Sequence, residues 1–281
     1  MFQIADGDQC ATARRLKLLS LLTLRMGRDR GVVEQQQVLF LQNRKGIQMH
    51  ANKLKRFIKE IPLIGPWATK AYRAARFGTK SKPFSGSASY WESRYASGGN
   101  SGVGSYEKFA EFKAEVINKF VADHDVQSVI EFGCGDGNQL KLAAYHSYLG
   151  LDVSSTAIQK CRKEFAGDAT KRFASVSEYH GEKMDLALSM DVIYHLVEDA
   201  IFAQYMRTLF ESSNRYVVIY SSNQEAKQSP DAVHVRHRKF TTFIDLNLTE
   251  WKLMQHIPNR FPFQGDYTTG SFADFFIYER A

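Results

Sequence analysis

The sequence predicts an α/β domain in which a mostly parallel sheet carries helices on both faces. From residue 127 onward, short apolar runs of strand length alternate with segments of helical period. The last two apolar runs are separated by a loop and not by a helix. Strands joined through helices run parallel, whereas strands joined by a loop can pair as an antiparallel hairpin. We therefore expect a parallel sheet with a hairpin at one edge.

The pattern assigns most of this part of the chain to strands and helices. A helix is expected at 106–121, where Phe109, Phe112, Val116, Ile117 and Phe120 form one apolar stripe. The segment 78–105 is rich in Gly and Ser and is expected to be a loop. The expected strands are 127–132, 148–153, 172–176, 184–189, 215–221, 251–257 and 273–280. The other expected helices are 138–146, 155–165 and a long one within 192–213.

Composition separates a basic N-terminal part from the rest of the 281-residue chain. Residues 1–80 hold 16 Lys and Arg against 5 Asp and Glu, whereas the remainder holds 21 against 25. The three expected parts are a poorly ordered basic segment (1–52), a basic amphipathic helical extension with a linker (53–85) and the α/β domain (86–281). A basic arm on an acidic domain favours a polyanionic partner, either a membrane surface or a nucleic acid.

Residues 53–77 are the candidate for a membrane contact. Leu54, Phe57, Ile58 and Ile61 recur at helical spacing between Lys and Arg side chains. Such a helix can lie on an anionic membrane surface, or it can dock on its own domain with its lysines in water. No stretch reaches the ~20 apolar residues that a membrane-spanning helix needs. We expect a cytosolic protein, peripheral to the inner membrane face if the helix binds lipid.

The three cysteines, Cys10, Cys134 and Cys161, follow no metal or disulfide spacing. We expect reduced thiols and no metal site, because His and Cys do not cluster at ligand spacing.

The segment 129–140, VIEFGCGDGNQL, places three glycines directly after the first strand. Ligands of open α/β sheets bind beyond the carboxyl ends of the strands, which is where Gly133, Gly135 and Gly137 occur. Glycine permits positive φ and a close approach of the main chain to a ligand. The third glycine of a dinucleotide fingerprint is replaced by Asn138. The loop therefore predicts a pocket for a flat, polar ligand other than a dinucleotide.

Two acids flank the glycine loop. Glu131 precedes the first glycine by two residues, where it would repel a pyrophosphate and attract an ammonium group. Asp152 ends the second strand, where a carboxylate can accept hydrogen bonds from the vicinal hydroxyls of a ribose. A ribose and an ammonium group without phosphate describe S-adenosylmethionine.

With these features, E-x-G-x-G-x-G after the first strand, an acid after the second and a terminal hairpin, the chain resembles class I S-adenosylmethionine-dependent methyltransferases over about residues 90–281. The segments YWESRYASGGNSGVGSYEKFAEFKAEV and SMDVIYHLVED are similar to those of bacterial methyltransferases associated with polysaccharide and glycan biosynthesis. The resemblance implies a Rossmann-like sheet of seven strands in the order 3-2-1-4-5-7-6, with the last strand antiparallel.

The resemblance also implies which residues hold the cofactor. Glu131 and the loop from Gly133 to Gly137 would hold its methionine end, Asp152 its ribose, and residues near Ser175 its adenine. Val153, beside Asp152, and Asp191, at the exit of the fourth strand, join the expected cofactor-binding set.

Candidate catalytic and substrate residues follow the fourth and fifth strands. His195 is a candidate general base, with Asp191 beside it, because a histidine can take a proton at neutral pH. Tyr194 is a candidate substrate contact. The run HVRHRKF brings further candidates for substrate binding, for an acidic sugar or a diphosphate-linked acceptor: His234, Arg236 and His237. The alternatives are a packing role for His195 and a solvated basic loop for HVRHRKF.

The predicted function is transfer of a methyl group to a hydroxyl of a glycan precursor or another small polar metabolite. Methylation of nucleic-acid bases is disfavoured, because SMDV stands where amino-methylating enzymes carry Asn/Asp-Pro-Pro-Tyr, and the Pro-Cys pair of cytosine-carbon methylation is missing. Three alternatives stay open: an NAD-dependent oxidoreductase, a non-catalytic cofactor-binding protein, and an RNA or protein methyltransferase recruited by the basic arm.

Overall fold

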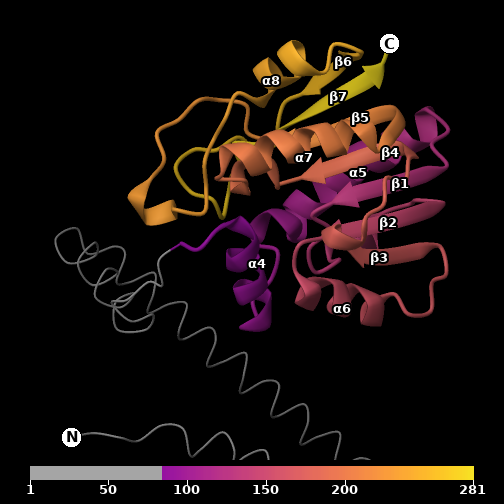
Figure 1. Ribbon diagram of the computed structural model, residues 1–281, viewed down its shortest axis with the longest axis horizontal. Helices are drawn as coiled ribbons and strands as arrows, with labels where there is room; N and C mark the ends of the chain where they lie inside the picture. Colours follow the sequence, from indigo (N-terminus) through magenta and orange to yellow (C-terminus); the bar gives the residue numbers. More distant parts are fainter. Residues whose placement is uncertain (1–83) are drawn as a thin grey trace, which may run out of the picture. The chain divides into compact units, whose positions relative to one another are not determined.

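The computed structural model describes residues 84–281 (Figure 1). The predictions for residues 1–83, including the basic helix within 53–77, lie outside the described residues. Within the described part, seven strands form one sheet in the order β3-β2-β1-β4-β5-β7-β6, as predicted. The strands are β1 Ser128–Phe132, β2 Ser147–Asp152, β3 Lys171–Ser175, β4 Met184–Met190, β5 Ser213–Ser221, β6 Trp251–Ile257 and β7 Asp274–Arg280.

The pairing of the strands matches the expected architecture. The five strands from β3 to β5 pair in parallel, whereas β7 is antiparallel to both of its neighbours, β5 and β6. The carboxyl ends of the parallel strands therefore meet at one edge of the sheet, where the loops after β1, β2 and β4 come together.

Helices cover both faces of the sheet. The apolar sides of α5 and α6 contribute to one core, and those of α7 and α8 contribute to the other. Adjacent residues of β1 face opposite cores, with Val129 in the first and Ile130 in the second, as the two-residue period of a strand requires. The helices are α4 Ser87–Ala96, α5 Glu107–Asp123, α6 Ser155–Glu164, α7 Asp199–Glu211 and α8 Phe240–Asn247.

Helix α4 contradicts the expectation of a continuous loop over 78–105. Its weakly amphipathic sequence, SASYWESRYA, lies between Gly- and Ser-rich flanks, so local pattern did not reveal it. Long-range contacts hold it in place. The Ser87 hydroxyl donates to the His195 carbonyl oxygen (2.6 Å), and Glu92 accepts from the Ser154 hydroxyl (2.7 Å).

Two other expected helices are shorter than predicted. In place of a helix over 138–146 there is a 3₁₀ helix, Gln139–Leu142. It stops because Asn118 of α5 donates to the Leu142 carbonyl and accepts from the Ala144 N–H, which satisfies the backbone in an extended conformation. The segment 192–213 divides into a 3₁₀ turn, Ile193–His195, and α7. Among residues 84–281, no helix is both long and apolar enough to cross a bilayer.

Candidate active site

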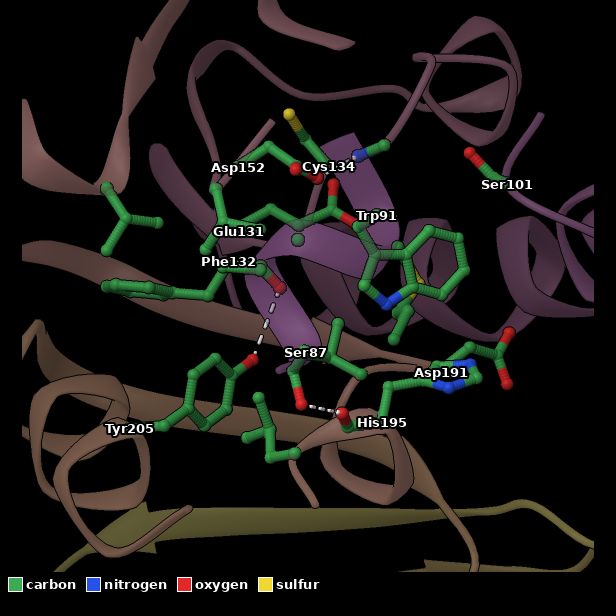
Figure 2. A pocket seen from close by; sticks show the side chains of 18 of the residues that line it. Ser87, Trp91, Ser101, Glu131, Phe132, Cys134, Asp152, Asp191, His195 and Tyr205 are labelled. Carbon is green, nitrogen blue, oxygen red and sulfur yellow. Dashed lines mark hydrogen bonds between the residues drawn. The ribbon is translucent and has the colours of Figure 1, made fainter. Parts of the chain in front are cut away.

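A cavity of about 490 Å³ lies at the carboxyl ends of β1, β2 and β4 (Figure 2). Its walls include the residues that follow these strands and residues of α4, which closes one side. Four of its lining side chains are carboxylates: Glu131, Asp152 and Asp191, which were predicted as site residues, and Asp136, which was not. The topology therefore brings together acids that are up to 60 residues apart along the chain.

Glu131 is a buried acid with an incomplete set of partners. The residue is 4% exposed, and its Oε2 accepts a hydrogen bond from the Tyr148 hydroxyl (2.5 Å), whereas no described residue donates to Oε1. Burial raises the pKa of Glu131 to about 7, although the Tyr148 hydrogen bond and the charge of Lys113 oppose the shift. A cationic donor in the cavity would satisfy Oε1 and favour the ionised carboxylate.

Asp152 is held by the backbone on both sides. Its Oδ2 accepts from the Gly135 N–H (2.9 Å) and its Oδ1 from the Ser154 N–H (2.8 Å). Burial raises the pKa of Asp152 to about 6 in spite of these hydrogen bonds. Each carboxylate oxygen has a further lone pair, so the side chain can accept hydrogen bonds from two hydroxyl groups of a ligand in the cavity.

The glycine loop has the left-handed backbone that its sequence predicts, with φ of 85° at Gly133, 58° at Gly135 and 76° at Gly137. A Cβ on Gly135 would lie 2.3 Å from the Ser101 Oγ, and one on Gly133 would lie 2.4 Å from a methyl group of Val192. These glycines therefore make room for the chain's own side chains as well as for a ligand.

Replacing Gly135 with alanine is expected to lower the free energy of unfolding by about 1–3 kcal/mol. The left-handed backbone disfavours a Cβ, and that Cβ would displace Ser101. Urea unfolding of the variant and the wild type measures the difference. The matched control is Gly167→Ala, because a Cβ there meets no atom within 4 Å. Equal losses in the two variants would contradict the account.

Asp191 is a further acid in the wall of the cavity. It has a left-handed φ of 59°, and its carboxylate accepts from Lys113 Nζ (2.7 Å) and from the Tyr194 hydroxyl (2.7 Å). Lys113 comes from the buried side of α5 and is 1% exposed. The Lys113 ammonium fixes the Asp191 carboxylate within the described structure. Sequence reasoning missed Lys113, since a lysine beside an apolar stripe is usually solvated.

A second cavity of about 550 Å³ adjoins the first. The two cavities share four lining residues: Trp91, Ser101, Asp191 and His195. The predicted substrate residues Tyr194, His234 and His237 line the second cavity. A ligand in the first cavity and a ligand in the second would therefore meet beside Asp191 and His195.

The carbonyl oxygen of His234 determines which ring nitrogen of His195 carries the proton. Its Nδ1 lies 3.1 Å from the carbonyl oxygen of His234, which can only accept a hydrogen bond. In the neutral ring, Nδ1 therefore carries the proton and Nε2 keeps a lone pair. Burial, as the main cause, lowers the pKa of His195 to about 4, so that the ring is neutral at pH 7. No described residue is hydrogen-bonded to Nε2, which leaves this lone pair for a ligand.

Other predicted residues lie farther from the cavities. Ser175 caps the 3₁₀ helix that follows β3, while its neighbour Val176 lines the first cavity. Gly137 lines neither cavity. Arg236 donates to the Val197 carbonyl (3.1 Å) and pairs with Asp199 (3.0 Å), and it also lines neither cavity. Its role in binding substrate stays a prediction, which this placement does not favour.

Trp91 was not singled out from the sequence, yet it lines both cavities. It belongs to α4 and its ring meets the His195 ring edge to face, with 4.8 Å between the centroids. Val153, which was predicted to bind the cofactor, also lines the first cavity.

Comparison with known proteins finds a matching family and a similar fold. Residues 106–260 match the model of a family described as methyltransferase domain. The N-methyltransferase NodS from Bradyrhizobium japonicum WM9, solved in complex with S-adenosyl-L-homocysteine, is 14% identical, with a TM-score of 0.52 over 69% of this chain and 98% of NodS. This likeness shows that the fold is shared. No curated protein matches the chain.

A second similar structure is the magnesium protoporphyrin IX methyltransferase ChlM from Synechocystis PCC 6803 with bound SAH. It is 14% identical, with a TM-score of 0.47 over 60% of this chain and 83% of ChlM.

Proposed function

The chain belongs to the methyltransferase domain family, and we propose that it transfers a methyl group from S-adenosylmethionine to a hydroxyl group of a small polar acceptor, such as a glycan precursor. The observation that carries the proposal is the meeting of two cavities at His195 and Asp191, one of them lined by the acids that a sulfonium nucleoside requires.

The first cavity fits S-adenosylmethionine by the chemistry of its donors and acceptors. The open Oε1 of Glu131 suits the ammonium group of the methionine end, and the spare lone pairs of Asp152 suit the ribose hydroxyls. Val153 and Val176 offer apolar surface beside Asp152 for an adenine ring. When bound, S-adenosylmethionine supplies an electrophilic methyl group and a neutral thioether leaving group.

The residues at the shared wall have distinct tasks in the proposed reaction. His195 accepts the hydroxyl proton at Nε2, while the carbonyl of His234 holds its Nδ1–H and fixes the ring. A pKa near 4 is sufficient for this base, because the hydroxyl proton becomes strongly acidic as the oxygen bonds to carbon. The neutral ring also adds no positive charge beside a sulfonium ion.

Asp191 contributes a negative charge in a fixed position to the same wall. Lys113 and Tyr194 hold both of its carboxylate oxygens, so that the carboxylate does not swing toward the acceptor. Trp91 of α4 packs edge to face against the His195 ring and helps to hold it in place. The chain's contribution is therefore alignment and proton removal.

The family match disfavours the alternative of an NAD-dependent oxidoreductase. Recruitment of RNA, of a protein substrate or of a membrane by the basic arm concerns residues outside the described part, and it stays a prediction. A non-catalytic protein would bind the cofactor without turnover, and release of S-adenosylhomocysteine on addition of an acceptor distinguishes this case.

The affinity for S-adenosylhomocysteine is expected to rise at least about tenfold between pH 5.5 and pH 7.5. Glu131, with a pKa of about 7, and Asp152, with a pKa of about 6, hold protons at low pH in the unliganded protein. Ammonium and hydroxyl donors favour their ionised forms, so binding releases protons in this range. Isothermal titration calorimetry of the full chain across the pH range measures both effects.

The Glu131→Gln variant is the matched test of this pH dependence. It should bind more weakly at pH 7.5 and show a flatter profile between pH 6 and pH 7.5, because its side chain does not titrate. A wild-type affinity that is unchanged from pH 5.5 to pH 7.5 would count against the proposed cofactor contacts.

A further inference from the structure

We propose that the second cavity selects an acceptor whose ring carries an anionic group, a carboxylate or a phosphate, held by Arg94 and Lys227. This inference rests on the proposed function, because it treats the second cavity as the acceptor site. It adds the charge of the substrate, which the methyl-transfer reaction itself does not specify.

The wall of the second cavity carries more positive than negative charge. The lining includes two cationic side chains, Arg94 and Lys227, and a single carboxylate, Asp191. Asp191 already has Lys113 and Tyr194 as partners. Among the side chains that the structure describes, no carboxylate pairs with either Arg94 or Lys227. The wall therefore has an excess of positive charge that a ligand can neutralise.

Arg94 is positioned to act inside the cavity. Its Nε donates to the Asn100 carbonyl (2.7 Å) and its Nη2 lies 3.5 Å from the Asn100 side chain, which fixes the guanidinium and leaves Nη1 without a partner among the described residues. The charge of Arg94 contributes to lowering the pKa values of His195 and His234, although burial is the larger cause. The charge of the Arg94 guanidinium therefore acts on His195, at the wall where methyl transfer would occur.

The neighbouring histidines do not supply the same charge. Burial lowers the pKa values of His195, His234 and His237, so all three rings are neutral at pH 7. His237 is anchored at Nδ1 by the Ser222 hydroxyl (2.7 Å). The neutral rings offer hydrogen bonds to hydroxyls, and recognition of an anion is left to Arg94 and Lys227.

Aromatic side chains in the wall of the second cavity offer apolar surface to a sugar ring. Tyr90 and His234 stack with 4.3 Å between centroids and 11° between planes, and His195 continues the stack at 5.6 Å and 10°. Phe272 also lines the cavity, and its ring lies edge to face with that of His237, with 4.4 Å between the centroids. Aromatic walls of this kind pack against the apolar face of a sugar ring while polar groups bind its substituents.

Three sugars with the same ring test the inference: D-glucuronate, α-D-glucose 1-phosphate and D-glucose. Their binding to the full chain, saturated with S-adenosylhomocysteine, is measured by saturation-transfer difference NMR. At low ionic strength the preferred anionic sugar should bind at least about fivefold more tightly than glucose, and the preference should shrink in ~0.3 M salt. Comparison of the carboxylate with the phosphate identifies the anionic group that is preferred.

The variant Arg94→Gln, alone and with Lys227→Gln, should reduce the preference to within about twofold, because the affinity for the anionic sugars falls toward that for glucose. Arg260→Gln is the matched control, because Arg260 pairs with Glu115 and lines neither cavity. Equal binding of the three sugars, absence of binding by both anionic sugars, or a preference that survives the double substitution would overturn the inference. Loss of S-adenosylhomocysteine binding in wild-type protein would instead refute the proposed function.

Discussion

Replacement of His195 by alanine is expected to lower the turnover number about 100-fold or more, while the affinity for S-adenosylhomocysteine changes by less than about threefold. The substitution removes the Nε2 lone pair that the structure presents between the two cavities. It leaves Glu131 and Asp152 in place, so the cofactor contacts are retained. Turnover is measured as formation of S-adenosylhomocysteine at saturating cofactor and acceptor.

The pH profile of the wild-type enzyme provides an independent check on this base. A histidine whose pKa is lowered to about 4 is already neutral above pH 5, so its contribution to turnover is lost only as the pH falls through about 4. Titration of His195 is therefore expected to cause no change in the turnover number at saturation between about pH 6 and pH 8. An inflection near pH 6.5 that disappears in His195→Ala would show that the ring titrates as an ordinary histidine.

His146→Ala is the matched control for the His195 experiment, since His146 is exposed and lines neither cavity. The control should retain wild-type turnover. If His195→Ala kept more than a third of the wild-type turnover, the residue would have a packing role, and a different group would have to remove the proton.

Replacement of Lys113 by methionine is expected to lower the free energy of unfolding by about 3–5 kcal/mol. Lys113 is 1% exposed, and its ammonium lies 2.7 Å from the Asp191 carboxylate and 5.2 Å from the centre of the Tyr220 ring. Removal of the lysine leaves the Asp191 carboxylate, whose side chain is only 15% exposed, with the Tyr194 hydroxyl as its remaining hydrogen-bond donor. Urea unfolding monitored by circular dichroism measures the loss.

A double-mutant cycle separates the ion pair from the packing of the lysine side chain. Lys113→Met combined with Asp191→Asn should lose less stability than the sum of the two single substitutions, because the double variant has no unpaired charge. Lys119→Met is the control, since Lys119 forms an exposed pair with Asp123 and should change the free energy of unfolding by less than about 0.5 kcal/mol. Additive losses in the cycle would refute the coupling.

The sheet and the cofactor cavity could be predicted from the sequence because their signals are local. Short apolar runs mark the strands, and neighbouring residues of a run, such as Val129 and Ile130, face opposite cores. Glu131 is the second-last residue of β1 and Asp152 is the last residue of β2, and parallel strands bring their carboxyl ends to one edge of the sheet. The fold therefore places these side chains once the strands are assigned.

The parts that were missed depend on contacts between distant segments. Lys113 and Asp191 are 78 residues apart, and nothing near Lys113 in the sequence indicates a buried partner. Helix α4 is held in place by contacts with Ser154 and with the backbone of His195, and its own sequence does not indicate these contacts. The tautomer of His195 likewise follows from the carbonyl of His234, whose position requires the folded chain.

Binding of S-adenosylhomocysteine to wild-type protein and to Asp152→Ala, measured by calorimetry near pH 7.5, tests the central claim most directly. The account predicts clear saturable binding by the wild type and by the surface control Asp245→Ala, and an affinity at least about 30-fold lower for Asp152→Ala, since two hydrogen bonds to an acidic side chain are lost. An Asp152→Ala protein that binds as tightly as the wild type, or a wild type that binds none, would contradict it.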